Sequence, residues 1–400
     1  MESKARIWSR AAAALLGLGV SVGSSAWALN AQTQLRQLTS TLPGLVAPPA
    51  VMVKAGLLQP VSASVASPSQ VDALRGAIWR QPLYQRLLNE HFVQTSNRAG
   101  DAAPEVEREA RILGRLGWRD TNTTQNLLLR SALHERYGTL LDRADSLLRR
   151  GRLGNSTFQF LIAIENVPQV RGLVVARLRQ HVPWRGGFFT FGNMMGTPHF
   201  QAARLATVRD LLRSGDQVER YEAAGLLNGM ATTGKSAEAY SLWTHIAKVR
   251  PGEGIFDGTF KWTASVSPVG IPFEWQFGSG EGYSTSVSGF GSSGMDIQWD
   301  GRGIPTFLSQ VVRMRPAARY VLDIETDQAN DLAALVRPVL ACGSDAVLFD
   351  AVGKHGNVVR FTAPAGARCG YPQFMLGGRP LDYARPISLH LRQLKLTAQG

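Results

Sequence analysis

The amino-acid sequence predicts an α+β protein of two domains, an α-helical repeat followed by an antiparallel β-sandwich. Apolar residues recur at helical spacing between residues 71 and 250. After Ile255 this spacing ends, and short runs rich in Phe, Trp, Thr and Val alternate with Gly, Ser and Pro. The chain has 400 residues, which exceeds the usual size of a single core, so two domains are expected.

The N-terminus has the three parts of a secretory signal peptide. Lys4, Arg6 and Arg10 supply positive charge, an apolar run follows, and small residues precede a cleavage site after Ala28. We therefore assign residues 1–28 as a signal peptide and expect a periplasmic or secreted protein of a Gram-negative-type bacterium. An uncleaved anchor is the alternative. No later stretch is apolar enough to predict a transmembrane segment.

Residues 29–70 are rich in Pro, Ser and Ala and carry few charges, which predicts a flexible linker. Helices are expected from residue 71 to about 250, joined by short turns that contain Gly or Pro. One predicted helix opens at Pro104 and stops at Gly117, and another is capped within Thr121–Thr124 and carries Leu127, Leu128 and Leu133. Further helices are predicted at about 155–165, 168–181, 198–213, 217–230 and 236–248.

Two turns in the helical half, Gly100-Asp101 and Tyr137-Gly138, lie about 37 residues apart, near the period of tetratricopeptide repeats. The segments 140–150 and 237–251 resemble the second helix of such a repeat. The resemblance implies stacked helix pairs with a concave face for an envelope protein partner. A plain helical bundle without a partner groove is the alternative.

The second half, residues 255–398, reads as eight or nine short strands, among them FKWTASV at 260–266 and ISLHLRQLKLT at 387–397. In the strand YVLDIET, alternation places Tyr320, Leu322 and Ile324 on one face. The spacing of the strands is typical of sandwiches and barrels.

The chain has two cysteines, Cys342 and Cys369, both in the β half. In an oxidising compartment such a pair predicts a disulfide, with two buried thiols as the alternative. A closed zinc site needs further ligands that the sequence does not place nearby, so no metal is expected there.

The order of motifs in the β half, from FDGTF through PFEWQFGSGEG and QWD to VVRFTAPAGARC and ISLHLRQLKL, resembles the jelly roll of carbohydrate-binding modules and galactose-binding-like domains. The whole chain resembles exported bacterial proteins that join tetratricopeptide-like helices to such a module and are associated with exopolysaccharide. The resemblance implies glycan binding without a cofactor, and it allows a structural calcium ion near a loop.

Four aromatic residues are the candidate glycan-binding residues: Trp262, Tyr283, Trp275 and Trp299. The face of a sugar ring stacks on an indole or phenol, while neighbouring polar groups bind its hydroxyls. Because large aromatic residues also fill sandwich cores, the alternative is that these rings are core residues. Trp262 and Tyr283 are the stronger candidates.

No motif for nucleotide binding, zinc proteolysis or acyl transfer occurs, and no pair of carboxylates stands out for glycoside hydrolysis. No catalytic residue is therefore assigned. The formal net charge is +13, but the basic residues are scattered, which disfavours nucleic acid and fits a solvated surface or an acidic polysaccharide.

These observations lead to the hypothesis of a non-catalytic accessory protein of polysaccharide production or export, with a glycan-binding sandwich and a partner-binding helical scaffold. A cell-envelope interaction scaffold with a purely structural sandwich is the alternative. A polysaccharide hydrolase or lyase is the third interpretation.

Overall fold

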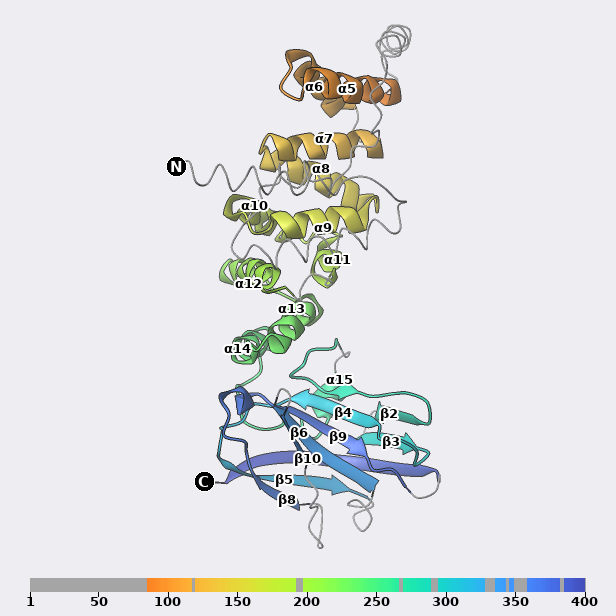
Figure 1. Cartoon of the computed structure of the whole chain (residues 1–400), viewed down its shortest axis with the longest axis vertical. Helices are drawn as coiled ribbons and strands as arrows, with labels where there is room; N and C mark the ends of the chain where they lie inside the picture. The colour runs from red at the N-terminus through yellow and green to blue at the C-terminus, as the bar shows by residue number, and fades with distance from the viewer. Residues whose placement is uncertain are drawn as a thin grey trace. The chain divides into compact units, whose positions relative to one another are not determined.

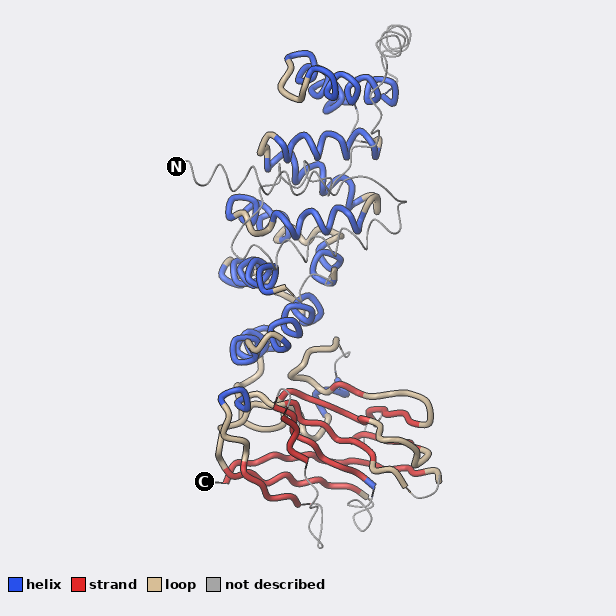
Figure 2. The backbone as a smooth tube through the Cα atoms, viewed as in Figure 1, coloured by secondary structure: helices blue, strands red, loops and turns tan. Residues whose placement is uncertain are grey.

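The computed structural model describes nine stretches of the chain: 85–116, 119–191, 197–265, 269–288, 294–327, 335–342, 345–348, 358–381 and 385–399. The predicted signal peptide, the predicted linker and the start of the predicted helical region lie outside them. The chain divides into two compact units, the first ending at Asp216 and the second beginning at Gln217. Helices make up the described part of the first unit, whereas the strands all belong to the second (Figures 1 and 2). The predicted order of helices followed by a β-sandwich is confirmed.

The helices of the first unit begin at regular intervals. The eight helices form four consecutive pairs. The first helix of each pair starts at residue 85, 121, 154 or 185, and the second helix at residue 104, 137, 168 or 198, so corresponding helices start about 30 to 36 residues apart. The bounds are α5 Gln85–Ala99, α6 Pro104–Leu116, α7 Thr121–Leu133, α8 Tyr137–Arg149, α9 Gly154–Ile164, α10 Pro168–Leu178, α11 Arg185–Thr190 and α12 Pro198–Arg213.

Polar bonds between residues roughly one interval apart join these helices. The indole of Trp184 donates to Asp145 at 2.7 Å across 39 residues of sequence. The guanidinium of Arg204 donates to Glu165 at 3.2 Å across the same separation, and both side chains are almost fully buried. A buried carboxylate must have partners, so each of these bonds fixes how one helix packs on a later one.

Glu107 of α6 forms a comparable link on the side of that helix that faces α7. Its carboxylate accepts hydrogen bonds from Arg130 of α7 at 2.9 Å and from Arg136 at 3.1 Å. These two hydrogen bonds, that from Arg130 first, lower the pKa of Glu107 to about 2. Arg130 is buried, so Glu107 also neutralises a charge that water does not reach.

The second unit begins with two helices, α13 (Arg220–Thr232) and α14 (Ser236–Ala247), which pack on each other ahead of the strands. The described strands are β1 Gln276–Phe277, β2 Tyr283–Val287, β3 Met295–Trp299, β4 Thr306–Val311, β5 Arg319–Thr326, β6 Val336–Cys342, β7 Asp345–Leu348, β8 Val358–Thr362, β9 Gln373–Gly378 and β10 Ile387–Gln399.

The strands form two five-stranded antiparallel sheets in the orders β1-β4-β9-β6-β7 and β2-β3-β10-β5-β8. Within them β3 pairs with β10, β4 with β9, β5 with β8, and β6 with β7. This nested pairing, in which the first of eight strands meets the last, is the topology of a jelly roll. The two strands that precede this set, β1 and β2, extend one edge of each sheet.

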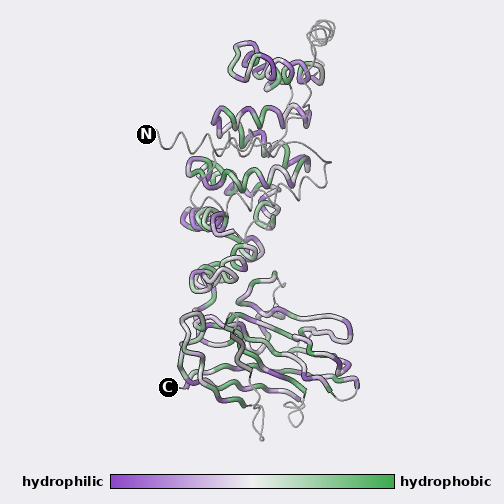
Figure 3. Tube along the Cα trace, in the orientation of Figure 1, coloured by the Kyte–Doolittle hydropathy of each residue, from purple (hydrophilic) through white to green (hydrophobic). Residues whose placement is uncertain are grey.

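The core of the second unit lies between the two sheets and draws apolar residues from both. In β5 the side chains of Tyr320, Leu322 and Ile324 are all buried, as the alternation predicts. Both hydrophilic and hydrophobic residues occur along the strands and along the helices (Figure 3). None of the helices within the described stretches is long and apolar enough to cross a membrane.

One predicted strand is wrong. Residues Lys261–Ser265, expected in an extended FKWTASV segment, form the short helix α15. The carboxylate of Asp257 accepts hydrogen bonds from the backbone N–H of Trp262 at 3.0 Å and of Thr263 at 2.7 Å. These bonds satisfy the donors that the first turn of a helix leaves open, and this local capping outweighs the strand propensity of the segment.

The carboxylate of Glu274 joins the helix pair to the sandwich within the second unit. Glu274 lies just before β1 and is 5% exposed. Arg220 of α13 donates to it through Nε at 3.0 Å and also through Nη2, and the indole of Trp243 in α14 donates at 3.1 Å. The ring of Trp243 packs on Phe273 with centroids 5.5 Å apart. One carboxylate thus binds α13, α14 and the first sheet together.

The predicted disulfide between Cys342, at the end of β6, and Cys369 is present, with Cα atoms 5.2 Å apart. The two cysteines are 27 residues apart in sequence, and the loop that the disulfide closes contains β7 and β8. We expect replacement of both cysteines by serine to lower the free energy of unfolding of the second unit by about 3 kcal/mol. Urea unfolding followed by tryptophan fluorescence measures this loss. Equal midpoints for the two proteins would show that the bridge contributes nothing.

Glu274→Gln should destabilise the second unit by about 2 kcal/mol, because the substitution leaves the Arg220 guanidinium without its counter-charge in a largely buried place. The exposed Glu281→Gln provides a matched control that should change stability by less than about 0.5 kcal/mol. Urea midpoints of the two variants compare them directly. Similar midpoints would contradict a structural role for Glu274.

Glu107→Gln should destabilise the first unit by about 1–2 kcal/mol at pH 7. Because its pKa is lowered in the folded state, the stabilisation by Glu107 is present above pH 4.5 and is lost as the pH falls toward 2. The stability difference between wild type and variant should therefore shrink between pH 5 and pH 3. A difference that stays constant over this range would rule out the ion pair as its source.

Candidate functional site

Two of the four predicted glycan-binding residues, Trp275 and Trp299, lie in the core of the sandwich. Their side chains are 2% and 4% exposed. Each indole N–H is satisfied by a backbone carbonyl, that of Asp257 at 3.0 Å for Trp275 and that of Arg302 at 2.8 Å for Trp299. Neither ring presents a face on which a sugar could stack.

Tyr283 is partly buried at the edge of the same core. It opposes Trp299 across the β2–β3 ladder, so its side chain shares the inward face. Its ring lies edge-on to Phe307 at 6.2 Å and covers the backbone of Gly280 so closely that a side chain at Gly280 would collide with it. Contacts within the protein therefore cover much of the Tyr283 ring.

Trp262, on α15, is partly exposed, but its ring already has two partners. The guanidinium of Arg220 lies over it at 4.4 Å from the ring centroid, and Phe256 meets it edge-on at 5.1 Å. A cation over the face of an indole is a favourable contact in its own right. The structure thus places Trp262 against Arg220, the residue that also binds Glu274.

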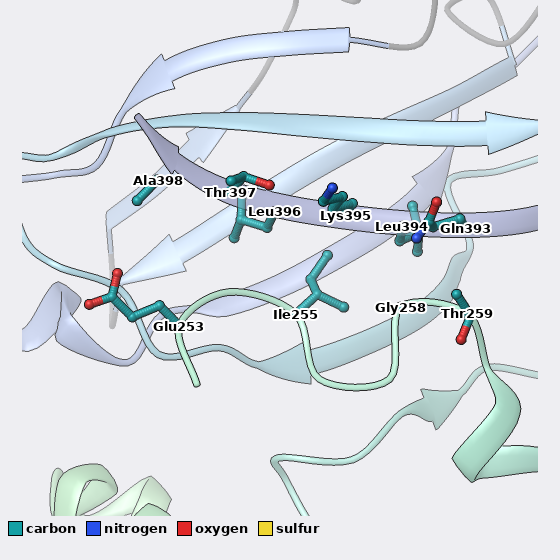
Figure 4. A pocket seen from close by; sticks show the side chains of 10 residues that line it. All are labelled: Glu253, Ile255, Gly258, Thr259, Gln393, Leu394, Lys395, Leu396, Thr397 and Ala398. Carbon is teal, nitrogen blue, oxygen red and sulfur yellow. The ribbon is translucent and has the colours of Figure 1, made fainter. Parts of the chain in front are cut away.

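A hollow in the second unit offers a better candidate site, which sequence reasoning did not find. Its volume is about 530 Å³, and it lies between strand β10 and the loop that leads from α14 into the sandwich (Figure 4). The residues that line it are Glu253, Ile255, Gly258, Thr259 and the β10 segment Gln393, Leu394, Lys395, Leu396, Thr397 and Ala398.

The hollow exists because β10 changes partners along its length. Residues 387–391 pair with β3 on one side, whereas residues 391–399 pair with β5 on the other. Beyond β3, the open edge of β10 is met by the loop, and the backbone N–H of Leu394 donates to Gly258 at 2.8 Å. Gly258 allows this approach, since any side chain there would collide with the Leu394 carbonyl.

Several bonds hold the loop in place. The hydroxyl of Tyr240 in α14 bonds Gly252, the N–H of Gly254 donates to the carbonyl of Arg313 at 2.8 Å, and the side-chain amide of Gln310 bonds both backbone groups of Phe256. Because these contacts form within the protein and need no ligand, the loop wall of the hollow is preformed, and the entropic cost of ordering it on binding is lowered.

The lining combines apolar side chains with a polar rim. Leu394 and Leu396 are buried in the sandwich core, at 1% and 6% exposure, so the partly buried Ile255 and Ala398 supply most of the apolar surface of the hollow. Gln393, Lys395 and Thr397 extend from the opposite face of β10, away from the loop (Figure 4), and on that face Lys395 and Thr397 are exposed and Gln393 is half-buried. In the register of β10 with β5, Lys395 lies opposite Asp323 and Gln393 lies opposite Glu325, and no side-chain hydrogen bond or ion pair joins these residues within the described part of the chain.

The rim contains one carboxylate, that of Glu253, which forms an ion pair with Arg315 at 3.1 Å. A lining of this kind can bind hydroxyl or carboxylate groups of a small polar ligand or of one or two sugar units. It lacks the pair of facing carboxylates that glycoside hydrolysis uses.

A second polar cluster lies on the outer face of the β2-β3-β10 part of the sheet. Nδ1 of His390 lies 2.7 Å from Asp296, and the Ser288 hydroxyl donates to Asp296 at 2.9 Å. The hydrogen bond with His390 is the main cause that lowers the pKa of Asp296. In a hydrolytic triad the serine bonds the other imidazole nitrogen. Here Ser288 and Asp296 share the Nδ1 side, so this cluster does not form a triad.

Within the described stretches, no group of three His, Cys, Asp or Glu side chains could hold a metal ion. No protein-family model matches the sequence, and no curated protein matches it significantly.

Proposed function

We propose that this chain is an exported, non-catalytic polysaccharide-binding protein of the cell envelope, in which the jelly roll binds a glycan at the β10 hollow. The single observation that carries the proposal is the hollow itself, which is lined by the partly buried Ile255 and Ala398 and by the polar side chains of Gln393, Lys395 and Thr397. Sugars combine apolar C–H faces with hydroxyls, so this lining matches both parts of their surface. The disulfide and the predicted signal peptide support a location outside the cytoplasm.

The helical unit supports a second part of the proposal, a surface for an envelope protein partner. Helix starts that recur every 30 to 36 residues are close to the tetratricopeptide period that the sequence suggests. Stacked helix pairs of this kind bury one face against their neighbours and leave an extended face for a partner. The proposed protein is therefore an accessory factor of polysaccharide production or export that joins a glycan to a protein.

The double substitution Lys395→Ala/Thr397→Ala should weaken glycan binding about tenfold, because it removes an ammonium donor and a hydroxyl from the rim. A glycan array, followed by gel electrophoresis in the presence of dextran, hydroxyethylcellulose or alginate, selects the polymer and measures the retardation. The control Arg319→Ala/Thr362→Ala alters a cross-strand pair of exposed residues on the same sheet, and it should bind like wild type. Binding that is equally strong in both variants would exclude the hollow as the glycan site.

A protein-interaction scaffold with a purely structural sandwich is the second candidate. The burial of Trp275 and Trp299 favours it, since the jelly roll then presents neither of these rings to a sugar. It predicts that no polysaccharide in the array or the gels retards the chain. Under that outcome, site-specific photo-crosslinking from the exposed faces of α8 and α10 in intact cells should yield a single discrete adduct with an envelope protein.

A further inference from the structure

Helix α6 carries an exposed basic stripe, defined here as Arg108, Arg111, Ile112 and Arg115. These residues stand at i, i+3, i+4 and i+7, so they share one face of the helix. All four are exposed, and Ile112 is 41% exposed. With a rise of about 1.5 Å per residue, the three guanidinium groups are distributed along roughly 10 Å of helix.

The rest of α6 holds the stripe outward. Val106 and Leu113 are fully buried on the opposite side, in the core that α6 shares with α5 and α7. Glu107 is bound to Arg130 and Arg136, and Glu109 lies 3.0 Å from His91. Two carboxylates of the helix are therefore directed to its neighbours. Glu105, three residues before Arg108, lies at the border of the stripe and is exposed.

Several other arginines of the first unit are neutralised by carboxylates of the same unit. Arg149 pairs with Asp145 at 2.8 Å, Arg171 with Asp210 at 3.3 Å, and Arg177 with Asp145 at 3.3 Å. Among the described residues, Arg108, Arg111 and Arg115 have no ion-pair partner and no side-chain hydrogen bond. Helix α6 therefore carries three unpaired arginines on one face, whereas α8, α10 and α12 carry arginines that are paired with carboxylates.

From this contrast we infer that the basic stripe of α6 binds a carboxylated polysaccharide. A guanidinium presents a planar fork of donors that matches a carboxylate, and a row of three matches a polymer that repeats its charge. Ile112 adds one apolar contact for the C–H surface of a sugar ring. A single isoleucine is too little apolar surface for insertion into a bilayer, which disfavours a lipid surface.

The basic stripe belongs to the first unit and the β10 hollow to the second, so the two binding proposals can be tested and contradicted independently. The inference takes only the class of ligand, polysaccharide, from the proposed function. The probe is alginate, a polymer of uronate residues, with uncharged dextran as the reference and phosphatidylglycerol vesicles as the test for a lipid surface.

The test compares wild-type full-length protein with Arg108→Gln/Arg111→Gln/Arg115→Gln in alginate gels. We expect the triple variant to lose about tenfold in apparent affinity, and the wild-type retardation to weaken with added salt. The control Arg152→Gln/Arg179→Gln/Arg360→Gln removes the same charge from other exposed positions and should lose less than twofold. Unchanged far-ultraviolet circular dichroism and melting temperature would exclude unfolding of either variant.

Three results would overturn the inference: no retardation of wild type by alginate, equal losses in the two triple variants, or binding to phosphatidylglycerol vesicles that depends on the stripe without binding to alginate. The Lys395→Ala/Thr397→Ala variant separates the two proposals. If it alone loses alginate binding, the hollow binds the polymer and the stripe does not. If only the stripe variant loses alginate binding while the hollow variant loses a different glycan, both proposals stand.

Discussion

The second unit depends on one buried carboxylate. Glu274 is removed from water, and a buried charge is tolerated only where donors surround it. Arg220 and Trp243 come from two different helices, so satisfying Glu274 requires α13 and α14 to pack against the start of the first sheet. The same arginine then covers Trp262. A ring that the sequence offers as a sugar platform is therefore part of the junction between the helix pair and the sandwich.

That junction also determines where the candidate site lies. The chain leaves α14 with Tyr240 bound to Gly252, and it must then reach the sheet within a few residues. It does so along the open edge of β10, where Gly258 contacts Leu394. The nested order of a jelly roll gives the last strand a partner on each side, but β3 accompanies only the first half of β10. The loop covers the remaining edge incompletely, and the uncovered part is the hollow.

The two halves of the fold could be predicted from local sequence, because helical spacing and strand alternation are properties of neighbouring residues. Tyr320, Leu322 and Ile324 face the core as their alternation requires. Helix α15 could not be predicted from local sequence, since it depends on the orientation of the Asp257 side chain. The hollow could not either: its two walls are about 140 residues apart in the chain, and Lys395 and Thr397 read in sequence only as the outer face of a strand.

The polar clusters of the second unit differ in what they leave available to a ligand. Asp296, His390 and Ser288 satisfy one another, and the imidazole presents to them the nitrogen that a nucleophile would not use. At the β10 hollow, by contrast, the exposed Lys395 and Thr397 form no hydrogen bond or ion pair among the described residues, although Lys395 lies opposite Asp323 of β5. The proposal that this hollow binds a ligand rests on that difference, because polar groups that are already bound to one another must break those bonds before they can bind a ligand.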